Sequence, residues 1–488
     1  MNSKSIIRFR KLFFSNLGVK QTIIKNTFWL TIGDAGSRFL KLVLLIYVAR
    51  ILGATEYGKF NFALSFVLLF NVFADLGLNQ IIVREFAKED RKEKDFSSLL
   101  SLKILLGLGV LILILISSFV ITPDSIIRKV IWILALSNII SDVFLIFYAF
   151  LQARQKMECE GVVRISEALF LIGMGLAVLF YFPSIENLSF CYLFASLFSL
   201  IVILLFFHFK IQELSLSWSK SVWKKYLSMS WPLALISLSY IIYNRIDSVM
   251  MGCLGQITQT GWYNAAYRII TATIIPTGII SNSFFPVLSK AFKESKEKFQ
   301  RIWNYLTEIM ILLATPLVIG GVVLSPRIIN FIYDESFSPS ILAFQILIVM
   351  AGIIFLYNSF RWVLIAANQQ KKLFFAVLSG AIINIILNLV LIPKYSLYGA
   401  AVATVITHIL IFILLVNYTL RFTTIRPFNL KIIISFVGAI LSSLGMYVVI
   451  IQSQIYYLNI VLTILIGAGI YSICLFGYKK IVNRYSWR

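Results

Sequence analysis

The chain carries little charge and almost no histidine for its length. Only 13% of its 488 residues are charged, two are histidine and four are cysteine. The cysteines stand far apart without a CxxC pair, and no spacing typical of a metal site or a Cys/His catalytic site occurs. We therefore expect no metal site, no catalytic residues and no bound cofactor.

Hydrophobic residues take the place of the missing charge. They make up 59% of the chain, and the mean hydropathy is +0.89, whereas a soluble protein of this size needs a more polar surface. Apolar runs such as Ile104–Val120 and Cys191–Phe207 are of the length that crosses about 30 Å of hydrocarbon as a helix. Barrel strands are shorter and alternate apolar with polar residues. The sequence predicts an all-α integral membrane protein.

The apolar periods predict fourteen transmembrane helices. Of the 44 Lys and Arg residues, six lie in predicted outer loops and five within predicted spans, which leaves 33 on the other side. The positive-inside rule assigns that side, with both termini, to the cytoplasm of a bacterial inner membrane. The predicted spans are 26–48, 60–82, 99–121, 130–151, 163–182, 188–207, 227–250, 262–287, 304–324, 341–363, 373–392, 398–418, 429–450 and 456–477.

Residues 1–25 form a basic segment before the first span, without the small-residue cleavage site of a signal peptide. We expect this cytoplasmic arm to contact anionic lipid headgroups. Nucleic-acid binding would need a soluble basic domain, which the sequence lacks.

Two parts of the sequence resemble each other at an offset of 202–203 residues, which carries the first predicted helix onto the seventh and the second onto the eighth. An even number of helices per repeat preserves orientation, so the halves are predicted to be parallel repeats. The predicted domains are an N-lobe at 26–209, a cytoplasmic linker at 210–226, a C-lobe at 227–420, and a final helix pair with a cytoplasmic tail at 421–488. The matching residues are Trp29 with Trp231, Leu52-Gly53 with Leu254-Gly255, Gly58 with Gly261, Asn61 with Asn264, and Asn79 with Asn282.

Three groups of residues between about 20 and 425 resemble the bacterial polysaccharide flippases of the multidrug/oligosaccharidyl-lipid/polysaccharide exporter superfamily. The resemblance implies the two-lobed, V-shaped fold of multidrug and toxin extrusion transporters. It also implies translocation of undecaprenyl-pyrophosphate-linked oligosaccharide, alongside a polysaccharide polymerase and glycosyltransferases. The residues are Ala49–Gly53, Glu56–Phe60 and Asp75–Leu78; Tyr243–Asp247, Gly261–Arg268, Pro276 and Phe285-Pro286; and Asn384, Asn388, Ile392-Pro393 and Tyr398–Ala401.

Charges within predicted spans point to a binding cleft, because an ion near the bilayer centre costs at least about 2.5 kcal/mol. Asp34, Arg38 and Lys41 share one helix face through their i, i+4, i+7 spacing. That face either holds a structural Asp34–Arg38 pair or lines a cleft that binds pyrophosphate. Arg245 and Arg268 are expected to add cations from the second repeat. The remaining cation, Arg361, reads as an ordinary cytoplasmic-side anchor.

Other polar and small residues in the spans have two interpretations each. Asp247 cannot share the face of Arg245, which leaves it for a neighbouring helix or for a coupling ion. Proton or sodium coupling through Asp34 or Asp247 is a further hypothesis. Asn384 and Asn388 are predicted to make interhelical hydrogen bonds. Glycine and proline interruptions, at Gly33, Gly36, Pro276 and Gly278, fit either hinges or close helix packing.

Two other functions compete with lipid-linked sugar transport. A small-molecule or multidrug exporter of the same superfamily would favour acidic binding residues for cationic drugs, whereas this cleft is predicted to be cationic. A membrane polymerase or ligase of lipid-linked sugars would carry large outer catalytic loops, and the predicted outer loops are short. The favoured prediction is a flippase that works by alternating access.

Overall fold

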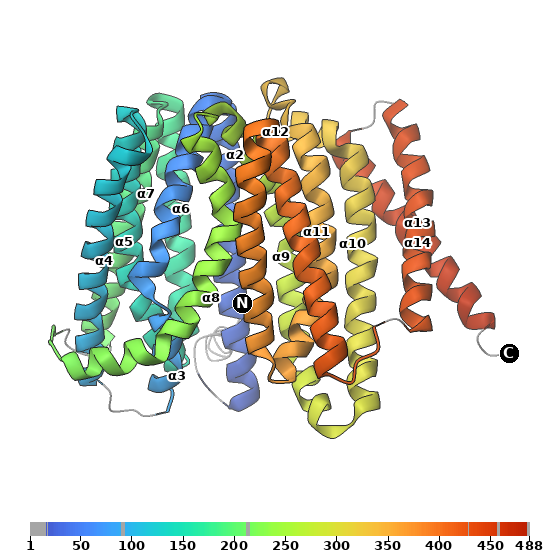
Figure 1. Cartoon of the computed structure of the whole chain (residues 1–488), viewed down its shortest axis with the longest axis horizontal. Helices are drawn as coiled ribbons and strands as arrows, with labels where there is room; N and C mark the ends of the chain where they lie inside the picture. Colours follow the sequence, from blue (N-terminus) through green and yellow to red (C-terminus); the bar gives the residue numbers. More distant parts are fainter. Residues whose placement is uncertain are drawn as a thin grey trace, which may run out of the picture. The chain divides into compact units, whose positions relative to one another are not determined.

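The computed structural model describes residue 16 and residues 18–88, 93–210, 215–427, 429–455 and 459–485. Throughout these ranges the regular structure is helical, without a strand (Figure 1). Most of the predicted basic arm lies outside the described residues. The helices are α2 (Val19–Asp75), α3 (Leu78–Phe86), α4 (Glu93–Ile121), α5 (Ser125–Ala153), α6 (Met157–Tyr181), α7 (Ile185–Lys210), α8 (Lys220–Cys253), α9 (Ile257–Glu294), α10 (Lys296–Ile332), η1 (Glu335–Phe337), α11 (Ser340–Ala366), α12 (Gln370–Phe422), α13 (Leu430–Ile455) and α14 (Ile460–Tyr485).

Twelve helical segments in the described part of the chain are long and apolar enough to cross a membrane. Two helices are each long enough for two crossings: α2 has 57 residues and α12 has 53, or about 85 and 80 Å at 1.5 Å per residue. Non-helical backbone interrupts α2 at Gly53 and α12 at Ser396. These helices therefore provide fourteen crossings, which confirms the predicted fold of a multi-pass helical membrane protein.

The chain divides into two compact units, unit 1 at Met1–Thr258 and unit 2 at Gln259–Arg488. The division follows α8, whereas the sequence placed a linker before it at 210–226. Helix α8 belongs with unit 1 because it packs along the second half of α2. A Cβ on Gly252 of α8 would meet the Phe62 ring, and one on Gly77 would lie 2.8 Å from the Leu233 Cβ. The lobe boundaries drawn from the repeat stay a prediction.

The two halves of the repeat have matching glycines with nearly the same positive φ. Gly53 has φ +75° and Gly255 has φ +74°, a region that glycine occupies without the steric penalty of a Cβ. Two residues beyond Gly53, the Thr55 hydroxyl lies 2.9 Å from the hydroxyl of its repeat partner Thr258. The matching turns are therefore in direct contact with each other inside unit 1.

The matching asparagines also make the same hydrogen bond. Asn61 donates to the Tyr57 carbonyl at 2.8 Å, and Asn264 donates to the Thr260 carbonyl at 2.9 Å. Both side chains are 1% exposed. Each asparagine satisfies its amide on its own helix, one turn back, so the motif Gly-x-aromatic-Asn serves one local purpose in both repeats.

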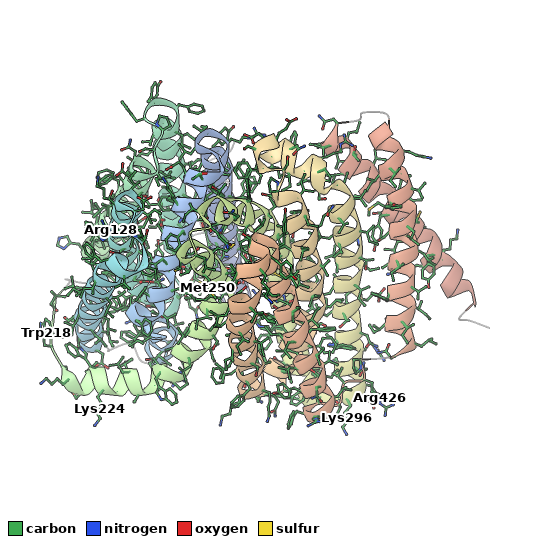
Figure 2. All side chains as sticks on the ribbon, turned by 45° about the horizontal axis from the view of Figure 1, so that its top comes forward. Arg128, Trp218, Lys224, Met250, Lys296 and Arg426 are labelled. Atoms are coloured by element: carbon green, nitrogen blue, oxygen red, sulfur yellow. The ribbon has the colours of Figure 1, made fainter. Side chains whose placement is uncertain are left out.

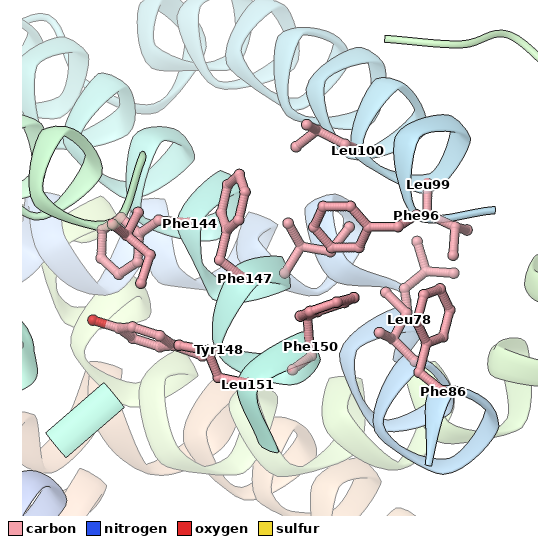
Figure 3. Close-up of a cluster of buried hydrophobic side chains, with 14 of the residues drawn as sticks. Leu78, Phe86, Phe96, Leu99, Leu100, Phe144, Phe147, Tyr148, Phe150 and Leu151 are labelled. Carbon is pink, nitrogen blue, oxygen red and sulfur yellow. The ribbon is translucent and has the colours of Figure 1, made fainter. Parts of the chain in front are cut away.

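An aromatic core fixes the helices of unit 1 at one end. Phe96 of α4 stacks on Phe207 of α7 with ring centroids 6.0 Å apart, and Phe147 of α5 meets Phe207 edge-on at 4.7 Å. Phe86 of α3 and Phe150 of α5 complete the contact (Figure 3). Such pairs contribute about 0.5–1.5 kcal/mol each beyond burial, so this core sets the positions of α3, α4, α5 and α7.

Candidate functional site

Close backbone contact joins α2 and α6 within unit 1. A Cβ on Gly33 would lie 2.8 Å from the Gly161 Cα, and a Cβ on Gly161 would lie 2.8 Å from the Trp29 carbonyl oxygen. Small residues allow membrane helices to approach this closely. Close packing, one of the two explanations for Gly33, is therefore confirmed. The contact creates an α2–α6 seam along which charged side chains from both helices meet.

Three ion pairs follow this seam. Lys25 Nζ of α2 lies 2.7 Å from Glu158 Oε2, and Lys41 Nζ lies 2.9 Å from Glu167 Oε1. Within α6, Arg164 and Glu160 form a third pair at 2.9 Å. Pairing offsets part of the desolvation cost of each ion. The sequence indicated Lys41 as a binding residue, but its partner Glu167 lies 126 residues away and was not recognised.

The predicted pair on the exposed face of α2 is present. Arg38 Nε lies 3.0 Å from Asp34 Oδ2, and the two side chains are 65% and 52% exposed within unit 1. The Lys41 side chain is 37% exposed. Arg38 and Lys41 therefore present positive charge at the surface of unit 1 from the middle of a predicted apolar span, the face that the sequence proposed for the cleft.

The other predicted site residues lie on α8 and α9. Asp247 is 1% exposed, and its carboxylate accepts a hydrogen bond from the Ser248 backbone at 2.7 Å. Arg245 of unit 1 and Arg268 of unit 2 are both partly exposed. Three of the four proposed binding cations thus belong to unit 1. That all four surround one cleft stays a prediction.

A second charged site lies inside unit 1, and sequence reasoning missed it. The ammonium of Lys103 in α4 is 2.6 Å from Asp75 Oδ1, and the Lys103 side chain is fully buried. Asp75 is the last residue of α2, where Leu76 and Gly77 turn the chain with φ of 49° and 74°. Lys103 is one of the 33 Lys and Arg residues that the sequence assigns to the cytoplasmic side. The sequence does hold a signal for this pair, because Asp75 and Lys103 have opposite charges and lie toward the same side of two consecutive predicted spans.

Asp142 of α5 extends this buried site. It is 3% exposed, and its carboxylate contacts the side chain of Asn71. The side chain of Asn138 lies 2.8 Å from the same Asn71 amide. The Asp142 carboxylate also interacts electrostatically with Lys103 and Asp75. One ammonium and two carboxyl groups therefore share the interior of unit 1, on three different helices.

No group of three or more His, Cys, Asp and Glu side chains in the described ranges could hold a metal ion. The charged sites are built instead from Lys or Arg beside Asp or Glu. Groups of this kind bind anions or protons, and the exposed cations of α2 suit an anionic ligand.

Known proteins are similar to this chain in sequence and in fold. The family described as polysaccharide biosynthesis protein matches residues 23–292. The capsular polysaccharide biosynthesis protein CapF of Staphylococcus aureus is 22% identical over 81% of this chain and 98% of its own length. A putative O-antigen transporter of Shigella flexneri is 24% identical over 80% of this chain and 96% of its own.

A solved structure of the lipid II flippase MurJ, in an inward closed conformation, aligns with a TM-score of 0.77 and 18% identity. The alignment covers 94% of this chain and 99% of MurJ. It shows that the two chains share a fold. With more than half of its residues matched by one family, this chain belongs to the polysaccharide biosynthesis protein family.

Proposed function

We propose that this protein is a flippase that moves undecaprenyl-pyrophosphate-linked oligosaccharide from the cytoplasmic to the outer leaflet of the bacterial inner membrane. Family membership supports a role in polysaccharide biosynthesis. Relatives are named for capsule biosynthesis and O-antigen transport. In this proposal the chain transports its substrate by alternating access and performs no catalysis, and both termini are cytoplasmic.

The exposure of Arg38 is the observation that carries the proposal. Its side chain is 65% exposed although it lies in an apolar span. A guanidinium facing lipid there would cost at least about 2.5–3.5 kcal/mol. The Arg38 face of α2 therefore lines a water-accessible path, where a planar cation can pair two oxygens of a pyrophosphate.

The proposed binding residues are Arg38, Lys41, Arg245 and Arg268. Lys41 can exchange Glu167 for a phosphate oxygen, because its side chain is already 37% exposed. Coupling to proton or sodium movement through Asp34 or Asp247 is a further part of the proposal. Asp34 pairs with Arg38, and Asp247 is 1% exposed.

Reconstituted vesicles test the proposal. The purified chain is placed in liposomes with a fluorescent polyprenyl-pyrophosphate oligosaccharide, and flipping is followed by protection from an added quencher. We expect the double variant Arg38→Glu/Arg245→Glu to lose flipping while inserting normally. The matched control Lys290→Glu, an exposed charge outside the site, keeps it. Normal flipping by the double variant would refute the cleft. Transport of a cationic dye without the lipid would favour a drug exporter.

A further inference from the structure

Unit 2 contains a cavity that the proposed transport path does not use. It has a volume of about 500 Å³ and lies where α9, α10 and α13 meet. Arg301 and Lys431 supply its charge, and Phe284, Val287 and Ile302 supply apolar walls. We propose that this cavity binds the phosphate head and upper acyl chain of an anionic phospholipid.

The charge of the cavity matches a phosphate. Within the described part of the chain, no carboxylate lies within ion-pair distance of Arg301. Lys431 is 3.8 Å from Glu308, whose other oxygen is bound by Lys479 at 2.6 Å. Glu308 is thus neutralised by Lys479. The cavity keeps a net positive charge on Arg301 and Lys431, both exposed.

Along the cavity, basic residues come first and apolar residues follow, as the phosphate of a lipid is followed by its acyl chains. Arg301 and Lys431 lie near the first turns of α10 and α13. Tyr305 follows Arg301 by one turn, about 6 Å deeper along the helix, and its ring lies 5.7 Å from that of Phe284. Val287 and Tyr305 are half exposed, so the apolar wall opens sideways for a chain. Tyrosine is typical of this interfacial depth.

The helices around the cavity are fixed to each other, so its shape is built into unit 2. Gln300 of α10 accepts a hydrogen bond from the Arg426 backbone at 2.7 Å and donates to the Arg426 carbonyl at 3.1 Å. Asn429, just before α13, donates to Asn304 at 2.9 Å. Lys296 and Arg426 lie at the same end of unit 2 (Figure 2), the end that the Lys and Arg distribution assigns to the cytoplasm.

The lining favours a phospholipid over the lipid-linked sugar. Besides its two cations, the cavity presents only the hydroxyls of Ser283 and Tyr305 as polar side-chain groups. The Ser283 hydroxyl already donates to the Ile279 carbonyl. An oligosaccharide needs many side-chain donors and acceptors, and these walls offer few. A single phosphate with its adjacent methylenes suits both the chemistry and the volume.

Lipid binding to the purified full chain in detergent tests this site by native mass spectrometry. We expect phosphatidylglycerol to bind the wild type about thirtyfold more tightly than the variant Arg301→Gln/Lys431→Gln, at roughly a factor of five per basic residue. Two controls should bind as the wild type does. They are Arg301→Lys/Lys431→Arg, which keeps the charge, and Lys290→Gln/Lys298→Gln, which removes two exposed cations outside the cavity.

Three results would overturn the proposal. If phosphatidylcholine, which has no net charge, bound as tightly as phosphatidylglycerol, net charge would not determine binding to this cavity. Displacement of the lipid by millimolar inorganic phosphate would show an anion site only. Preference for undecaprenyl pyrophosphate would assign the cavity to the transported lipid instead. Because binding is measured without transport, the result is independent of whether the chain flips sugars.

Discussion

Unit 1 and helix α12 of unit 2 hold polar groups within their spans in different ways. Unit 1 uses ions: Lys103 with Asp75 and Asp142 beside that pair, and Lys41 with Glu167. The two halves of α12 in unit 2 use neutral amides and hydroxyls instead. Asn384 donates to Thr407 at 3.1 Å and accepts from Asn388 at 3.0 Å, all three fully buried.

The contrast shows that packing helices in a membrane does not require ions. Neutral interhelical hydrogen bonds of about 0.6 kcal/mol serve this purpose between the halves of α12. The ions of unit 1 carry a much larger insertion cost, which fits the proposed role of Lys41 in binding an anion. The matching helices of the repeat also end differently. Helix α2 ends at Asp75, whereas α9 continues past the equivalent position, residue 278.

The largest expected effect comes from breaking the buried pair. Lys103→Met leaves the Asp75 carboxylate without its partner, and we expect a loss of about 3–5 kcal/mol in the free energy of unfolding. Thermal unfolding in detergent measures it. The double variant Lys103→Met/Asp75→Asn should recover most of the loss. Equal destabilisation in the double variant would show that packing, rather than charge, holds this site.

Neutralising Lys41 and Glu167 of the α2–α6 seam one at a time should have different effects on flipping. Lys41→Gln is expected to lower flipping about tenfold or more, the value of one charge-assisted hydrogen bond. Glu167→Gln frees Lys41 and should leave flipping at or above the wild-type rate. Flipping assays in vesicles compare the two. A purely structural ion pair would make both substitutions equally harmful.

The neutral network of unit 2 should affect stability alone. Asn384→Leu removes the hydrogen bonds to Thr407 and Asn388, and we expect a cost between about 0.6 and 1.7 kcal/mol. Flipping should stay within about twofold of the wild type once expression is matched, since a factor of two is only about 0.4 kcal/mol. A transport defect as large as that of Lys41→Gln would remove the distinction between the two units.

The smallest effect is expected at the repeat contact. The Thr55 and Thr258 hydroxyls are exposed, so Thr55→Val and Thr258→Val should each change the free energy of unfolding by at most about 0.5 kcal/mol. A double-mutant cycle measures their coupling. A coupling above about 1.5 kcal/mol would make this contact a structural requirement of the repeat.

Local features of the fold were predictable from the sequence, and the ion pairs between helices were not. The length of the apolar runs predicted the fourteen crossings, and the i, i+4 spacing predicted the Asp34–Arg38 ion pair. The interhelical hydrogen bond predicted for Asn384 is confirmed. Lys103–Asp75 and Lys41–Glu167 depend on how each helix is rotated against its neighbour, which hydropathy does not encode. Lys103 was therefore assigned to a helix end although its side chain is buried.

The most direct test of the central claim is the dependence of flipping on the head of the lipid. Vesicles containing the wild-type chain would receive the same labelled oligosaccharide on a polyprenol, attached either through pyrophosphate or through an uncharged linkage. We predict flipping at least about tenfold faster for the pyrophosphate, the value of one charged contact. We also predict that this preference is lost in Arg38→Gln. Equal rates for the two lipids would contradict the account.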